Sequence, residues 1–183
     1  MGDYYIVTPV DGPGFPAALG ANFASFTSRQ DISPTPRPVI NGYRLRLGSQ
    51  IEIESSGEFS TTGTPNLTLG HYIGSEAGAI TTVIAESAAI ATGNNAASWT
   101  WHLEWSGIVT GTGVAGEVVG DGFLDLGTSL TAISRSPIPT SSAQKMFPWD
   151  TTTAKAIGVC ATWSANSSSN AIRTLKHRVK LHN

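Results

Sequence analysis

The chain has 183 residues, a net charge of −2 at neutral pH and a single cysteine, Cys160. This length accommodates one domain with a substantial core, and the near-zero charge argues against a protein that binds polyanions. One cysteine excludes an intrachain disulfide and therefore a disulfide-stapled secreted scaffold. Charged residues make up only 13 % of the chain, about half of the usual fraction of roughly 25 %. With its many Gly, Ser and Thr residues, this composition favours a β-protein with many turns and with surface buried in an assembly.

The N-terminal sequence MGDYYIVTPVDGPG has neither the basic nor the apolar region of a secretory signal. No apolar run approaches the ~20 residues that span a bilayer. We therefore expect a soluble protein that is made in a reducing compartment and has no membrane partner.

Residues 1–42 carry six of the ten prolines, three of them in the run SPTPRP at 33–38. Proline fixes φ and removes a hydrogen-bond donor, so the pattern predicts an extended N-terminal arm ahead of a domain over 43–183. An arm rich in aromatic residues is expected to pack on its own domain or on a neighbouring subunit, the alternative being a flexible leader. Its candidate partner-contact residues are Tyr4, Tyr5, Phe15, Phe23, Phe26 and Arg37.

From residue 43 onward, apolar residues recur with a period of two, which is typical of strands with one buried face. The segment YRLRLGSQIEIESSGEF (43–59) alternates apolar residues with charged ones. The apolar set is Tyr43, Leu45, Leu47, Ile51, Ile53 and Phe59. Residues 77–92 fit either a helical stripe or extended chain, and their β-branched residues favour a strand.

The segment SWTWHLEWSG (98–107) contains three of the five tryptophans, Trp99, Trp101 and Trp105. Leu103 shares their face of the predicted strand, and this favours a buried row over an exposed aromatic platform. The next predicted strand, within GEVVGDGFLDLG, places two glycines on its apolar side. These are Gly120 and Gly122, and they would leave space for indole rings.

A carbohydrate-binding platform remains the alternative interpretation of the tryptophans. Trp149 is the strongest candidate for it, because proline and aspartate flank this residue in the predicted loop MFPWD. Elsewhere the pattern of short strands continues, with Ile157, Val159, Ala161 and Trp163 on one face of a late strand. Short strands, turn-rich connections and the lack of a long helical pattern predict an all-β, antiparallel β-sandwich of the jelly-roll type.

No motif in the sequence indicates catalysis. The four histidines form no HExxH or HxH pair, and no GxSxG or Walker A motif occurs. We therefore expect no enzymatic activity, no catalytic residues, no cofactor and no metal.

The C-terminal run RTLKHRVKLHN places Lys176, Arg178 and Lys180 on one face of a final strand, opposite Leu175, Val179 and Leu181. One interpretation is a solvated face whose charges also protect a sheet edge. The other is a basic strip that docks on a partner. Because no aromatic residues interleave with the basic ones, a protein partner is favoured over nucleic acid.

Three stretches of the chain resemble a known family of proteins. They are LRLGSQIEIESSGEFSTTGTPNLTLGHYIG, WHLEWSGIVTGTGVAGEVVGDGFLDLG and PWDTTTAKAIGVCATWSANSSSNAIR. In their order and composition the chain resembles tailed-phage minor capsid or head-decoration (cement) proteins. The resemblance implies a tumour-necrosis-factor-like jelly roll that forms a homotrimer on the outer capsid surface, with the major capsid protein as its partner. It also implies assembly into a virion after synthesis in the host cytoplasm. The alternative is a carbohydrate-binding β-sandwich of a phage tail or receptor-binding protein.

Overall fold

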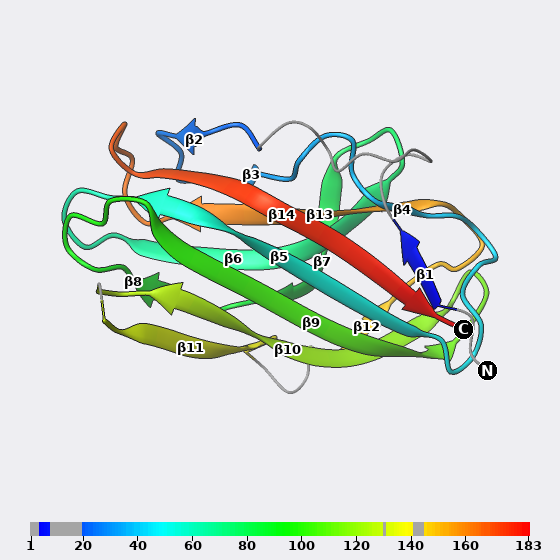
Figure 1. Ribbon diagram of the computed structural model, residues 1–183. Helices are drawn as coiled ribbons and strands as arrows, with labels where there is room; N and C mark the ends of the chain where they lie inside the picture. Colours follow the sequence, from blue (N-terminus) through cyan, green and yellow to red (C-terminus); the bar gives the residue numbers. More distant parts are fainter. Residues whose placement is uncertain (1–3, 8–19, 130, 141–144) are drawn as a thin grey trace.

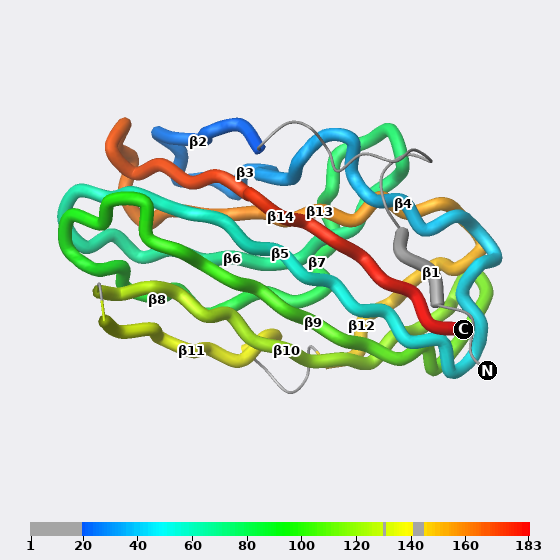
Figure 2. The backbone as a smooth tube through the Cα atoms, viewed as in Figure 1, coloured from blue at the N-terminus to red at the C-terminus, as the bar shows by residue number. Residues whose placement is uncertain are grey.

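The computed structural model describes residues 4–7, 20–129, 131–140 and 145–183. All regular secondary structure in these residues is β-strand, arranged in two antiparallel sheets that pack face to face (Figures 1 and 2). Within the same ranges, no helix has the length and hydrophobicity that crossing a bilayer would require. The prediction of an all-β sandwich is confirmed.

The larger sheet contains eight strands. Its main order is β1 (Tyr4–Val7), β14 (Ala171–His182), β5 (Gln50–Ser60), β9 (Trp99–Gly111), β10 (Glu117–Gly127) and β11 (Ile133–Ile138). Two short strands extend it: β2 (Phe23–Ala24) pairs with β14, and β12 (Met146–Pro148) pairs with β10.

The smaller sheet contains six strands. Its main order is β3 (Gln30–Asp31), β13 (Lys155–Trp163), β6 (Asn66–Ser75) and β7 (Ile80–Glu86). In addition, β4 (Val39–Ile40) pairs with β13, and β8 (Ile90–Ala91) pairs with β6. The ambiguous segment 77–92 is thus extended chain, as its β-branched residues favoured.

The connections between the sheets are jelly-roll-like. The set β1, β14, β5 and β9 lies against the set β3, β13, β6 and β7, and consecutive strands such as β5 and β6, or β13 and β14, lie in opposite sheets. This interleaving of two four-stranded sets is the arrangement of a jelly roll. Strands β10, β11 and β12 then widen the larger sheet beyond β9.

The tryptophan-rich strand fills the space between the sheets. Trp101 and Trp105 are no more than 2 % exposed, and Trp163 of the smaller sheet belongs to the same core, where its ring packs on Phe59. A Cβ on Gly120 would overlap the indole of Trp105, and a Cβ on Gly57 would lie 2.7 Å from a ring atom of Trp101. The interpretation as core is confirmed for Trp101 and Trp105, and Gly120 makes room for a ring as predicted. Trp99 is half-buried, and a Cβ on Gly122 would meet the backbone of Glu104 and not an indole.

The period-two pattern begins before the strand does. Residues 43–49 form turns, in which Tyr43 has a φ of 63° and is 79 % exposed, and Leu47 is 71 % exposed. The Ser49 N–H bonds the carbonyl of Arg46 at 3.0 Å instead of a neighbouring strand. The predicted strand start at residue 43 is therefore wrong, and β5 begins at Gln50.

A bulge in β14 changes which residues face the core. Its register against β5 shifts between Thr174 and Lys176, so that Leu175 has no partner and is 43 % exposed. An extra residue on one strand reverses the alternation of side chains beyond it. The expectation that Leu175 faces the core is wrong, whereas Val179 and Leu181 are buried as predicted.

The described part of the predicted arm belongs to the sandwich. Strand β2 pairs with β14, and β3 and β4 pair with β13. Phe26, Ile32 and Ile40 contribute to the same core as the rest of the chain. The core therefore does not begin at residue 43, and residues 20–42 are structurally inseparable from it.

Candidate functional site

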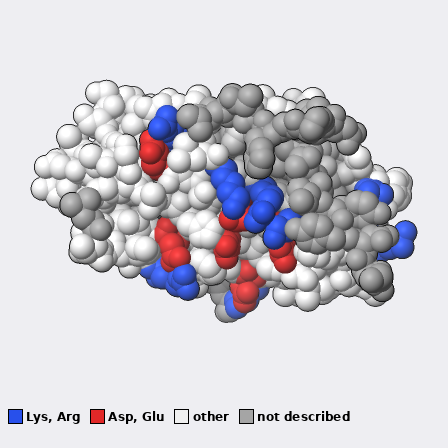
Figure 3. All heavy atoms as spheres, viewed as in Figure 1, with Lys and Arg blue, Asp and Glu red and all other residues white. Residues whose placement is uncertain are grey.

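The outer face of the larger sheet carries most of the charge in the view of Figure 3. Alternation along β5 directs its glutamates outward, and the reversed alternation after the β14 bulge directs the basic residues to the same side. The antiparallel register places Arg178 opposite Glu54 and Lys180 opposite Glu52. Opposite charges in facing positions stabilise an antiparallel pair.

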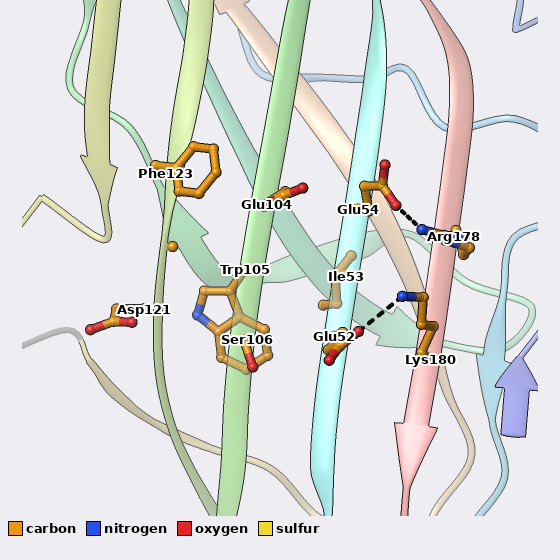
Figure 4. Close-up of a pocket in the computed structure, with 11 residues that line it drawn as sticks. Glu52, Ile53, Glu54, Glu104, Trp105, Ser106, Asp121, Phe123, Arg178 and Lys180 are labelled. Atoms are coloured by element: carbon orange, nitrogen blue, oxygen red, sulfur yellow. Dashed lines mark hydrogen bonds and ion pairs between the residues drawn. The ribbon is translucent and has the colours of Figure 1, made fainter. Parts of the chain in front are cut away.

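These charges form what we call the ion-pair array, composed of Glu52, Glu54, His102, Glu104, Lys176, Arg178 and Lys180. Lys176 and Arg178 each bind one oxygen of Glu54, and the Lys180 Nζ donates to Glu52 Oε2 at 3.1 Å (Figure 4). The predicted basic strip is therefore neutralised by its neighbouring strand. Strand β1 pairs with β14 only at Val179–His182, so of the three basic residues Lys180 alone has a described strand on both sides.

Two carboxylates of the array, Glu52 and Glu54, are held in the ionised form. Partial burial by itself raises the pKa of Glu54, but hydrogen bonds and charge from Lys176 and Arg178 outweigh it and lower this pKa to about 2. The pKa of Glu52 is also lowered, because Lys180 and His182 outweigh the effect of burial. Neither group is suited to donate a proton near neutral pH.

His102 on β9 joins two of these carboxylates. Its Nε2 lies 3.5 Å from Glu54 Oε1 and 3.3 Å from Glu104 Oε1, and the three groups could each offer one ligand atom within 4.8 Å. Imidazole and carboxylate are ligands of divalent metals. However, Lys176 and Arg178 already occupy both oxygens of Glu54, so the geometry favours ion pairing over metal binding.

A groove of about 510 Å³ runs beside the array, between β14, β5, β9 and β10. Its rim is polar, with Glu52, Glu104, Asp121 and Lys180 among its lining residues (Figure 4). Trp105 also lines it but is only 2 % exposed, so the groove offers no tryptophan face for stacking on a sugar.

Trp149, the strongest sequence candidate for sugar binding, is buried. It is 1 % exposed and packs on Phe147, with the ring centroids 5.6 Å apart. Trp149 does follow β12 in a loop, but the expectation that it is exposed is wrong. Its side chain follows β12 into the core.

An exposed apolar row lies on the same outer face, toward the end of the sheet where β12 is. Val119 of β10 pairs with Ile108 of β9 on one side and with Met146 of β12 on the other. Ile108 is 52 % exposed and Met146 is 55 % exposed. We call these three residues the apolar row. The sequence contained a signal for it, because Ile108 has the same parity as His102 and Glu104 and so had to face outward.

Other exposed apolar residues lie near one end of this row. The Gly48 N–H donates to the carbonyl of Val109 at 2.9 Å, which brings the turn that carries Leu47 next to β9. Val114 in the β9–β10 hairpin is 77 % exposed. Leu47 and Val114 thus add exposed apolar surface at the same end of the strands.

The remaining predicted contact residues have different surroundings. Tyr4 and Tyr5 lie in β1, opposite His182 and Leu181, whereas Phe15 lies outside the described residues. Phe26 is buried and Phe23 packs against the same core. Arg37 binds Asp31 and donates to the Gly78 carbonyl at 3.1 Å. Phe23, Phe26 and Arg37 therefore contact this chain itself, and the structure does not bring the predicted residues together into one surface.

The site thus combines a self-neutralised array of charges with exposed apolar residues on one face of a jelly-roll-like sandwich. Such a face is suited to contact with another protein, because protein interfaces combine an apolar core with a polar rim. Compared with protein-family models, with curated proteins and with solved structures, the chain finds no match.

Proposed function

We propose that the protein is a structural virion subunit, a decoration protein that binds the outer surface of a capsid as a trimer and stabilises the shell. The observation that carries this proposal is the apolar row on the outer face of the larger sheet, in which Ile108 and Met146 are exposed and Val119 between them is half-buried. We assign this row to the contact between copies of the chain. We infer that the partner is a capsid shell because the sequence resembles phage decoration proteins.

The chemistry of the outer face supports a protein partner over a polyanion. Contiguous exposed apolar side chains mark protein contacts, because their burial removes apolar surface from water. The basic residues of β14 are each held by a glutamate, so they offer little charge for phosphate groups.

Trimeric assembly suits a decoration role for a physical reason. A closed threefold arrangement buries the same patch on every subunit. Three weak contacts to the shell then act together, and their combined affinity exceeds that of any one contact. Neither effect requires a catalytic centre.

The first test is the mass of the full chain in solution, measured by light scattering after size exclusion. The proposal expects three times 19.1 kDa, which is about 57 kDa. Ile108→Asp and Met146→Asp should each reduce the mass to that of the monomer. Val83→Asp, at a site 37 % exposed on the smaller sheet, is the matched control and should remain trimeric. A monomeric parent chain, or an unchanged trimer in both row variants, would contradict the assigned contact.

A second test separates the two functional classes. Shells assembled from the major capsid protein of the same virus should co-sediment with the trimer and survive higher temperature when it is bound. Cell-wall glycans should leave the tryptophan fluorescence unchanged, since four tryptophans are buried: Trp101, Trp105, Trp149 and Trp163. Saturable quenching by a glycan, without shell binding, would favour the carbohydrate-binding alternative.

A further inference from the structure

Three polar side chains meet inside the sandwich, away from the outer face. Ser55 of β5 and His71 of β6 are fully buried, and His177 of β14 reaches them from the strand next to β5. The Ser55 Oγ lies 2.9 Å from His71 Nε2 and 2.8 Å from His177 Nδ1. His177 Nε2 lies 3.1 Å from the carbonyl oxygen of Ile157 on β13. We call Ser55, His71 and His177 the histidine relay.

The relay has only one consistent arrangement of protons when both histidines are neutral. A carbonyl only accepts, so His177 Nε2 must carry the hydrogen that bonds Ile157. His177 Nδ1 then lacks a hydrogen and accepts from the hydroxyl of Ser55. Because that hydroxyl uses its hydrogen there, its oxygen accepts from the Nε2–H of His71. The chain therefore runs from His71 through Ser55 and His177 to Ile157, and it connects β6 and β13 of one sheet with β5 and β14 of the other.

A second proton on His177 would break this arrangement. Nδ1 would become a donor, so the Ser55 hydroxyl hydrogen would lose its acceptor on His177. It could bond His71 Nε2 instead only if His71 moved its hydrogen to Nδ1, which has no hydrogen-bond partner. The resulting cation would lie close to His71, whose ring centroid is 6.3 Å from that of His177. Among the described residues, no carboxylate forms an ion pair with either imidazole. The nearest acidic influence is Asp31 on β3, and this carboxylate is already bound by Arg37.

The surroundings indicate which histidine receives the proton. His71 is completely buried, and its Nδ1 has no hydrogen-bond partner. His177 is partly exposed and follows the bulge at Leu175 by two residues. His177 is therefore the less buried of the two imidazoles.

We propose that the histidine relay is an acid-operated latch between the two sheets, which stays closed while both imidazoles are neutral and opens beside the β14 bulge when His177 takes up a proton. This inference concerns the interior of the subunit and does not depend on the proposed virion role. The latch would make the free energy of unfolding of the sandwich higher near neutral pH and lower under mildly acidic conditions.

The direction of the pKa shifts supports this assignment. Burial lowers the pKa of His177 to about 4, and burial together with the charge of His177 lowers the pKa of His71 well below its usual value. In the unfolded chain both groups take up protons near pH 6.5. The unfolded state therefore binds more protons between pH 6.5 and about 4, and stability falls as the pH drops through this window.

The protonation states can be tested directly on the full chain by nitrogen NMR of its imidazoles. At pH 7 the expected result is the neutral Nε2–H tautomer for both His71 and His177. Neither ring should titrate between pH 7.5 and pH 5.5. A Nδ1–H tautomer in either residue, or a midpoint near 6.5 for His177, would overturn the proposal.

A thermodynamic test follows the unfolding equilibrium constant in urea at pH 7.5 and pH 5.0. For the natural sequence this constant should rise by about 30-fold from His177 alone. The triple variant Ser55→Ala, His71→Phe, His177→Phe replaces all three polar groups by apolar ones and should lose this rise. His102→Gln, on the outer face, is the matched control and should keep it. An equal rise in the triple variant would overturn the latch, and if that variant does not fold, the NMR titration decides.

Discussion

At the scale of single residues, Glu54 holds the outer face of the larger sheet together. It is the one carboxylate that contacts basic side chains from β14 and the imidazole of β9 at the same time among the described residues. Both of its basic partners are more than a third exposed, so water screens the attraction and the energetic gain is that of a surface network.

We predict that Glu54→Gln lowers the free energy of unfolding at pH 7 by about 1 kcal/mol, since it leaves Lys176 and Arg178 side by side without their carboxylate. Urea denaturation measures this change, with Glu76→Gln at an exposed turn as the control. The pKa of Glu54 is lowered, so its contribution is complete above pH 4.5 and disappears as the pH falls toward 2. The two proteins should therefore converge in stability in that acidic range, and a constant difference down to pH 2 would contradict the assignment.

A second residue-scale prediction concerns the space beside Trp105. Gly107→Ala would place a methyl group against the indole of Trp105, which is locked in the core. Overpacking of this kind costs about 1–3 kcal/mol. Gly111→Ala on the same strand is the control, because a Cβ there meets no heavy atom closer than 3.4 Å. Thermal unfolding of the two variants should differ clearly, and Trp105→Phe should partly rescue Gly107→Ala.

At the scale of elements, the part of the N-terminal segment that contributes strands β2, β3 and β4 to the sandwich begins at residue 20. Deleting residues 1–42 removes Phe26, Ile32 and Ile40 from the core together with β2, β3 and β4, so we predict that this truncation does not fold. This truncation therefore tests whether residues 43–183 form a separate domain, as the sequence predicts. Deleting only residues 1–19 leaves every described strand except β1.

The shorter truncation should therefore keep its cooperative thermal transition, measured by circular dichroism. It should bind shells more weakly, because it removes three of the predicted contact residues: Tyr4, Tyr5 and Phe15. Equal shell binding by the truncated and full chains would contradict a role of this segment in docking.

The strands that are long and half-buried were predictable, because alternation over five or more residues is typical of a strand with one buried face and rare elsewhere. This holds for β5, β9 and β10, whereas β13 is buried on both faces. Strands of two residues, such as β3 and β4, have no period to detect, so their place in the sandwich was not predictable. The turn at 43–49 continued the alternation by coincidence, since Arg44 and Arg46 happen to separate apolar residues.

The candidate site was only half predictable for a related reason. Parity showed that Glu54 and the basic residues of the last strand each face outward. It could not show that they face one another, because their pairing joins positions more than a hundred residues apart. The bulge at Leu175 sets this register, and a bulge leaves no regular mark on the sequence.

At the scale of the whole molecule, the proposed trimer depends on apolar contact rather than on charge. We predict that its mass in light scattering is the same in 0.05 M and 1 M NaCl, because salt screens ion pairs but does not weaken the burial of apolar surface. An assembly held by charge would dissociate at the higher salt concentration. That result would move the contact from the apolar row to the charged residues of the same face.

The position of β14 has a consequence for how the protein is made. This strand is synthesised after all the others that are described, yet it lies inside the larger sheet, between β1 and β5, and pairs Gln50 with His182. Until it emerges, β5 has an unpaired edge and the core beneath it stays open to water. Pairings over such long stretches of chain form slowly, and unpaired edges can join other chains. The nascent protein thus passes through a stage that is prone to aggregation, and a helper that shields β5 during synthesis would raise its yield.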